Sequence, residues 1–127
     1  CVGAKLLYQD RRIQHGGVIL GLGGVAGHAF KFYEGVSGKC NTRLNAVQDY
    51  SAVTGACLLV RKTLFKKLGG FNTKNLKVAF NDIDFCIRLK KLNYRVLWTP
   101  NALLYHHESV SRGNDYDSKN AKRFNDE

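Results

Sequence analysis

Alternating apolar and polar residues predict a β-hairpin at the start of the chain. Residues 4–8 (AKLLY) and 12–20 (RIQHGGVIL) read as strands, with Gln9-Asp10-Arg11 between them. Asp favours a turn because its side chain can bond the nearby backbone. From Gly21 to Asn45 the sequence is rich in glycine and shows little period, so we expect a mobile surface loop there.

Three segments in the middle of the chain carry clear patterns. The near-continuous apolar run over residues 50–60 (YSAVTGACLLV) predicts a central strand buried on both faces. Residues 61–68 form a short amphipathic pattern that ends at Gly69-Gly70, a typical helix stop. A second helix is predicted from Asp82 to Leu92, with Asn81 as its N-cap.

The last apolar segments, YRVLW and ALLYH, predict two strands separated by Thr99-Pro100, and the tail from Asn114 onward is polar. Strands that alternate with helices indicate an α/β layered fold with at least five strands.

Composition narrows the class of protein. A chain of 127 residues holds at most one domain of ordinary size. Its net charge of +10 favours an anionic partner, such as nucleic acid, an acidic membrane face or a phosphorylated small molecule. Four cysteines without a C-x-x-C motif indicate reduced thiols. Because the chain has no methionine and opens on Cys1, we expect it to be a piece of a longer protein.

Two acidic and two histidine residues are candidates for chemistry. Asp82 and Asp84 lie at a helix start, where unpaired N–H groups favour negative charge, and this alone could account for them. On a helix, side chains at i and i+2 point apart, so at most one of the two can be a working base. His106 and His107 end a strand and point to opposite faces, as a metal ligand or as hydrogen-bonded strand-end residues.

Other motifs carry less information. Arg112 could bind phosphate oxygens or be a solvated cation. The glycines from Gly21 to Ala26 fit the dinucleotide pattern G-x-G-x-x-A, but no helix is predicted after them and no acidic residue follows at the required distance. The P-loop pattern is also absent, since Tyr33 stands where its first glycine should be.

Taken in order, VTGACLLVRKTLFKKLGGF and AFNDIDFCIRLKKLNYRVLWTPNALLYHHESVSRG resemble the C-terminal half of family-2 glycosyltransferases of GT-A fold, and AKLLYQDRRIQHGGVILGLGG resembles a segment of their bacterial, rhamnosyltransferase-like members. The resemblance covers residues 1–113, and residues 114–127 form a polar tail. It implies the C-terminal portion of a mixed-sheet sandwich that binds nucleotide-diphosphate sugars.

The resemblance also implies roles for single residues. Asp82 matches the catalytic base, with Asn81 where the family more often has Glu. His106, or less well His107, matches the histidine that binds Mg²⁺ or Mn²⁺ on the donor diphosphate. Further residues are expected at the donor and acceptor cleft, namely Gly55, Asn81, Asp84 and Arg112.

The implied reaction moves a sugar, with inversion, from a nucleotide-diphosphate donor to a glycan or lipid-linked acceptor in cell-surface polysaccharide synthesis. The resemblance implies a cytoplasmic enzyme at the inner face of the membrane. The nucleotide-binding first half is not in this sequence, so we expect the isolated chain to be inactive and to self-associate, as a homodimer, through an open sheet edge. The alternative is a basic nucleic-acid-binding module without catalytic activity.

Overall fold

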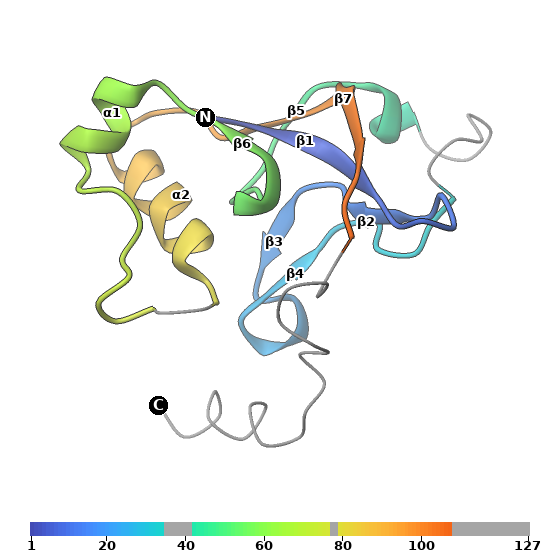
Figure 1. Ribbon diagram of the computed structural model, residues 1–127, viewed down its shortest axis with the longest axis horizontal. Helices are drawn as coiled ribbons and strands as arrows, with labels where there is room; N and C mark the ends of the chain where they lie inside the picture. The colour runs from blue at the N-terminus through green and yellow to red at the C-terminus, as the bar shows by residue number, and fades with distance from the viewer. Residues whose placement is uncertain (35–41, 77–78, 108–127) are drawn as a thin grey trace.

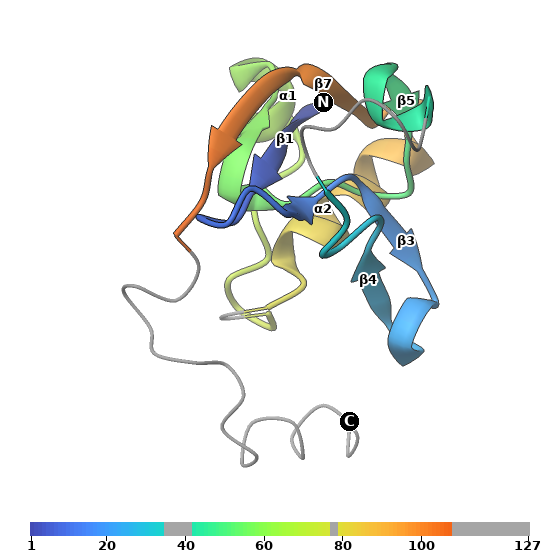
Figure 2. The same ribbon diagram turned by 90° about the vertical axis from the view of Figure 1, so that its right-hand side faces the viewer.

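The computed structural model describes residues 1–34, 42–76 and 79–107. These residues form a curled, mixed five-stranded sheet, a separate two-stranded ribbon and two α-helices (Figures 1 and 2). The predicted α/β class is confirmed at this level. Residues 114–127, and with them the expected domain boundary at residue 113, lie outside the described part of the chain.

The centre of the sheet is a parallel pair of strands from the two ends of the described chain. β1 (Val2–Leu7) and β7 (Leu97–Tyr105) pair along the whole of β1. Three short strands pair antiparallel with them: β2 (Ile13–His15) and β6 (Leu58–Leu59) with β1, and β5 (Gln48–Asp49) with β7. The sheet is therefore mixed, with β1 and β7 inside it.

The predicted hairpin at the start of the chain is confirmed. Asp10 accepts a hydrogen bond from the Arg12 amide at 3.0 Å, and Arg11 takes a positive φ of 67° in the turn between β1 and β2. The segment expected to form one second strand divides into two, because Gly17, with φ 105°, turns the chain before β3 (Val18–Leu20).

The glycine-rich stretch is more regular than its sequence indicates. β3 pairs antiparallel with β4 (Ala26–His28), and a short 3₁₀ turn at Leu22–Gly24 joins them. A second 3₁₀ turn spans Thr42–Asn45. Residues 21–25 are exposed, as expected of a surface segment, but residues 22–28 are regular instead of irregular, because backbone pairing compensates for a weak side-chain pattern. Residues 35–41 lie outside the described part.

The prediction of a central strand over residues 50–60 was wrong. The strand that forms there is β6, which has two residues and lies beside the start of β1, and Ala52 makes an isolated bridge with Val18. Residues Gly55–Cys57 form a 3₁₀ turn, which the Thr54 hydroxyl caps by accepting from the Ala56 amide. The apolar run is buried as an irregular segment, with Ala52 and Val53 fully inside the core.

Both predicted helices are present, on one side of the sheet (Figure 1). α1 spans Lys62–Lys67, and the positive φ angles of Gly69 and Gly70 follow it as expected. α2 spans Asn81–Lys91, and Phe85, Cys86 and Leu89 point into the core because they lie on one helical face. The core joins these residues to both sheets: Leu7, Ile13, Val18, Leu44, Ala52, Val53, Leu64, Val96 and Trp98.

The two strands expected on either side of Thr99-Pro100 are one strand, β7. Its register with β1 shifts where Ala4 faces Thr99 and Lys5 faces Leu103, so three residues bulge out. A bulge accommodates Pro100, which lacks an N–H to give to the sheet. The strand can therefore continue past the proline.

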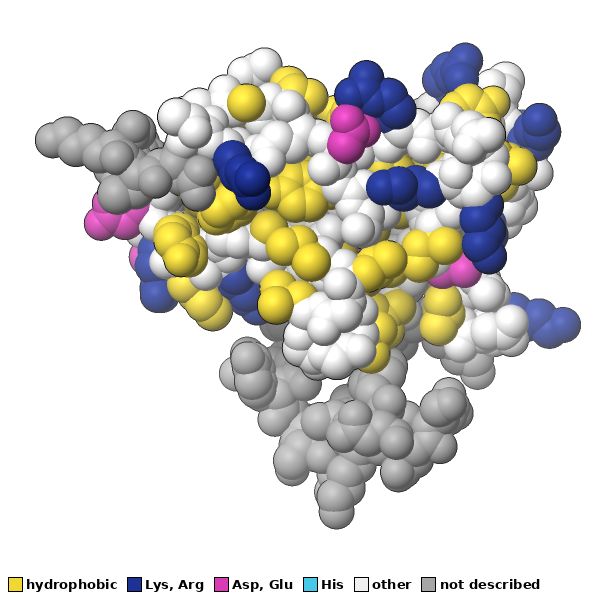
Figure 3. All heavy atoms as spheres, turned by 180° about the vertical axis from the view of Figure 1, so that it is seen from behind, with side chains coloured by type: hydrophobic (Ala, Val, Ile, Leu, Met, Phe, Trp, Pro, Cys, Tyr) yellow, Lys and Arg dark blue, Asp and Glu magenta, His cyan; other side chains and the backbone are white. Residues whose placement is uncertain are grey.

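On the side turned away in Figure 1, hydrophobic side chains gather across the middle of the surface, and lysines and arginines lie at separate positions around them (Figure 3). None of the helices in the described ranges has both the length and the apolar character required to span a membrane.

Candidate functional site

Helix α2 begins with an unusual backbone conformation. Phe80, the residue before its first turn, has φ 63°, and its carbonyl accepts from the Asp84 amide at 2.9 Å. Asn81 was expected to be the N-cap but is the first helical residue, and the residue at the cap position, Phe80, has no side-chain capping hydrogen bond. A bulky residue in the left-handed region is uncommon and strained, and such strain concentrates at functional sites.

The Asp82 carboxylate is held at the helix start by two backbone amides. Its Oδ2 accepts from the Gly55 amide at 2.8 Å, and its Oδ1 accepts from the Ile83 amide at 2.9 Å. The side chain is half-buried. Because each carboxylate oxygen can accept two hydrogen bonds, each keeps one direction for a further donor. The group is thus fixed in place and still able to accept a proton.

Gly55 lies so close to Asp82 that a side chain at this position would crowd the carboxylate. A Cβ on Gly55 would be 3.2 Å from the Asp82 Cβ and 3.7 Å from its Oδ2, and 3.8 Å from the Phe71 ring. The segment after Val53 and the start of α2, 27 residues apart, therefore meet through the Gly55 amide and the Asp82 side chain. The structure brings together two of the residues expected at one cleft.

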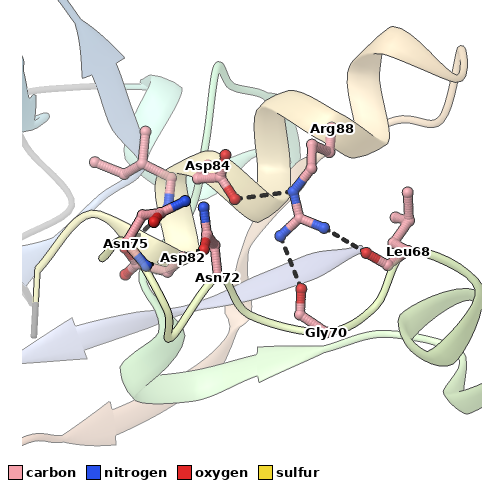
Figure 4. A network of polar contacts seen from close by, with 8 residues as sticks. Leu68, Gly70, Asn72, Asn75, Asp82, Asp84 and Arg88 are labelled. Carbon is pink, nitrogen blue, oxygen red and sulfur yellow. Dashed lines mark hydrogen bonds and ion pairs between the residues drawn. The ribbon is translucent and has the colours of Figure 1, made fainter. Parts of the chain in front are cut away.

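Asp84 pairs with Arg88, whereas Asp82 binds the Gly55 amide. The Asp84 Oδ2 accepts from Arg88 Nε at 2.8 Å, while the other guanidinium nitrogens donate to the Leu68 and Gly70 carbonyls at 2.6 and 2.7 Å (Figure 4). The expectation that Asp82 and Asp84 face different partners is confirmed.

A cavity of about 450 Å³ lies beside this ion pair, lined by residues 68–74 with Asp84 and Arg88. Asp82 is not among the lining residues, but Asp82 and the cavity residue Phe71 both lie within 4 Å of the point where a Gly55 Cβ would be. The cavity is lined largely by backbone and polar side chains, so it suits a polar ligand.

His106 and His107 have different hydrogen-bond roles. His106 Nδ1 lies 2.7 Å from Gln14 Oε1, which can only accept, so the proton is on Nδ1 and the Nε2 lone pair is available. His107 Nδ1 lies 2.7 Å from Gln9 Nε2, which can only donate, so His107 Nδ1 accepts. A metal-bound histidine normally donates its other N–H to an acceptor. The geometry of His106 fits this arrangement better than that of His107.

The structure does not bring the histidines to the carboxylate. Among the described residues, no hydrogen bond or ion pair joins His106 to Asp82, and the end of β7 is apart from the start of α2 in both ribbon views (Figures 1 and 2). The described residues also contain no group of three or more His, Cys, Asp or Glu that could hold a metal ion. Arg112 lies outside the described part.

A partly buried histidine pair was not predicted from the sequence. His15 is fully buried, and its Nδ1 lies 2.8 Å from His28 Nδ1. Burial, with a smaller effect of His28, lowers the pKa of His15 to about 3. Its position two residues after Ile13 was a signal for this burial, since alternate strand residues share a face.

The predictions for the cysteines and for the glycine motif can also be compared with the structure. Cys1, Cys57 and Cys86 are free thiols, as expected of the described cysteines, and burial raises the pKa of Cys86. The glycines at Gly21–Gly24 form the exposed tip of the β3–β4 ribbon, with a strand after them instead of a helix. The prediction that no helix follows this glycine motif is therefore confirmed.

The chain is similar to three bacterial proteins in different degrees. It is 51% identical over 124 residues to an uncharacterized protein of Sinorhizobium fredii. This match covers 98% of the chain and 14% of that protein. It is 36% identical over 115 residues to the O-antigen biosynthesis protein RfbC of Myxococcus xanthus, covering 90% of the chain and 9% of RfbC. It is 35% identical over 63 residues to the N-acetylglucosaminyl-diphospho-decaprenol L-rhamnosyltransferase of Mycobacterium tuberculosis, covering 50% of the chain and 20% of that protein.

The chain thus spans a fifth or less of the length of these curated relatives. No family model and no solved structure matches it.

Proposed function

We propose that this chain is part of a glycosyltransferase that acts in the synthesis of a cell-surface polysaccharide. Two relatives support the general class, because one is named for O-antigen biosynthesis and another for rhamnosyl transfer. The mixed α/β sheet is compatible with such a fragment. The observation that carries the proposal is the 2.8 Å contact between the Gly55 amide and the Asp82 carboxylate, which joins two segments expected at one sugar cleft.

The finer assignment is also a proposal. We assign residues 1–113 to the C-terminal half of a GT-A domain of family 2 and residues 114–127 to a polar tail, on the resemblance described above. In this assignment the nucleotide-binding half comes from elsewhere in a longer polypeptide. The isolated chain is then catalytically inactive.

Asp82 acts as the general base in the proposed mechanism. It accepts the proton of an acceptor hydroxyl while that oxygen attacks the anomeric carbon and the bond to the nucleotide diphosphate breaks, with inversion. The two backbone amides that hold the carboxylate fix its direction and leave each oxygen one free acceptor position. Asp84 is not a second base in this proposal, because Arg88 pairs with it.

The neighbouring residues shape the cleft. Gly55 allows the close backbone approach to Asp82, and Asn81 and Asp84 flank the base on α2. The polar cavity beside Asp84 is the proposed place for part of the sugar acceptor, a glycan or a lipid-linked saccharide at the cytoplasmic membrane face. Arg112 is proposed to contact the donor diphosphate, because a guanidinium can bind phosphate oxygens in a bidentate way.

In this proposal the described residues supply only one ligand to a divalent ion. His106 would supply one nitrogen ligand through Nε2, and further ligands would come from outside the described residues. When bound, Mg²⁺ or Mn²⁺ would stabilise the charge that develops on the departing diphosphate.

The test is an Asp82→Asn substitution in the longer polypeptide that contains this chain. Removing a positioned base lowers turnover typically by about 10²- to 10⁴-fold, and we expect that range with donor binding largely unchanged. Asp49→Asn is the matched control, because Asp49 is an exposed carboxylate paired with Arg95. Release of nucleoside diphosphate from a panel of nucleotide sugars measures both variants. Normal turnover of Asp82→Asn would contradict the proposal.

A further inference from the structure

Outside the proposed cleft, His15 and His28 form a pair whose protonation can be worked out from their contacts. Their Nδ1 atoms are 2.8 Å apart, and the rings meet edge to face at 5.0 Å between centroids. A hydrogen bond between two imidazole nitrogens needs an N–H on one and a lone pair on the other. At least one Nδ1 is therefore unprotonated.

A backbone amide decides which histidine donates. The Thr54 amide donates to His15 Nε2, over 3.4 Å, so this nitrogen carries no proton. His15 must then carry its proton on Nδ1 and donate it to His28. Burial keeps His15 neutral, since it lowers the pKa of this residue to about 3. His15 is thus a fixed acceptor for the Thr54 amide at neutral pH.

The Thr54 amide is the first of three consecutive amides bound by side chains. The Gly55 amide donates to Asp82 at 2.8 Å, and the Ala56 amide donates to the Thr54 hydroxyl at 3.3 Å. Only two soft dihedral angles separate the Thr54 and Gly55 amides, because the peptide bond is planar. Fixing the first amide on His15 therefore restricts the direction of the second.

We propose that His15 is a positioning residue for Asp82: it holds the Thr54 amide so that the Gly55 amide points at the carboxylate. The inference rests on the proposed role of Asp82 as a base. His28, on the neighbouring ribbon β3–β4, selects the tautomer of His15 that makes this possible. No contact between His15 and a substrate is required.

Three variants of the 127-residue chain separate this role from general packing. His15→Leu removes the acceptor, whereas His15→Gln restores one, because the Gln oxygen can lie where Nε2 was. Gln14→Leu is the matched control: Gln14 is the buried neighbour on β2, and it contacts His106 instead of Thr54. Nitrogen-15 NMR reports the His15 tautomer, the Gly55 amide shift and its hydrogen exchange.

We expect the wild-type chain to show His15 protonated at Nδ1. In His15→Leu the Gly55 amide should lose its hydrogen-bonded shift and exchange about tenfold faster, and His15→Gln should recover most of the difference. Gln14→Leu should change the His106 signals and leave the Gly55 amide as it is in the wild-type chain. An unchanged Gly55 amide in folded His15→Leu would overturn the proposal.

If His15→Leu does not fold, His28→Leu takes its place. His28 is only half-buried, and its loss should give mixed His15 tautomers and a shifted Gly55 amide. An unchanged Gly55 amide in this variant overturns the proposal as well.

Turnover of the longer polypeptide then tests the link to Asp82. Loss of an outer positioning partner at a functional site typically costs about 10- to 100-fold, so His15→Leu should lower kcat by about that factor with KM unchanged, and His15→Gln should restore it. If Asp82→Asn leaves turnover normal, the proposed function fails while the NMR result still reports the amide geometry. If Asp82→Asn is impaired and folded His15→Leu is not, only the positioning role fails.

Discussion

Replacing Arg88 with methionine tests how the loop that lines the cavity is held. The Arg88 side chain is 27% exposed, and its three donor nitrogens bind the Leu68 carbonyl, the Gly70 carbonyl and the Asp84 carboxylate. Methionine fills a similar volume and donates no hydrogen bond. Arg88→Met therefore removes all three contacts with little change in packing.

The magnitude follows from the exposure of these groups. A fully buried hydrogen bond to a charged group contributes about 1.5 to 3 kcal/mol, but water can reach this partly open site. We assign about 1 kcal/mol to each carbonyl contact and about 0.5 kcal/mol to the i,i+4 ion pair, so the free energy of unfolding should fall by about 2 to 3 kcal/mol. With a urea m-value of about 2 kcal/mol per molar, the midpoint should fall by about 1 to 1.5 M.

Urea unfolding of the 127-residue chain, followed by Trp98 fluorescence, measures this shift. Lys91→Met is the matched control, since it removes one positive charge from the exposed end of the same helix and should change stability by less than about 0.5 kcal/mol. Arg88→Lys keeps the charge but not the forked donors and should fall in between. Equal midpoints for Arg88→Met and Lys91→Met would refute the reasoning.

Further outcomes are expected for other residues. His15 has an ordinary pKa of 6.5 and a folded pKa of about 3, so the unfolded chain binds one more proton between these values. Stability should fall by about 2 kcal/mol from pH 7 to pH 5 in urea melts, and His15→Gln should remove most of this slope. Gly55→Ala brings a methyl within 3.2 Å of the Asp82 Cβ, so turnover of the longer polypeptide should fall about tenfold through misplacement of the carboxylate; wild-type turnover would contradict this. Calorimetry of the isolated chain should show only weak binding of nucleotide sugars, and tight, metal-dependent binding would contradict the assignment to an incomplete domain.

Local patterns predicted the elements that depend on nearby residues. The helix at Asn81–Lys91 follows from one apolar face, and the first hairpin follows from a turn around Asp10. The prediction of a strand over residues 50–60 was wrong because an apolar run indicates burial but not backbone conformation. Here Thr54 caps a 3₁₀ turn, and only Leu58–Leu59 pairs as a strand.

The candidate site was predictable by resemblance and not by local physics. Nothing near Asp82 in the sequence indicates that its partner is the amide of Gly55, because backbone amides look alike at every position. The contact of His15 with Thr54 crosses 39 residues and was missed for the same reason. Alternation shows which strand residues are buried but not which distant group they meet.

The parallel pairing of β1 with β7 has a consequence for how the chain reaches its fold. Residues 2–7 find their main neighbour only at residues 97–105, so almost every other described residue lies in the connection between them. Closing so long a connection is entropically unfavourable, and folds dominated by distant pairings form slowly. During synthesis, one edge of β1 would stay unpaired until residue 105 has left the ribosome. A chaperone that covers this edge would therefore be needed most during that interval.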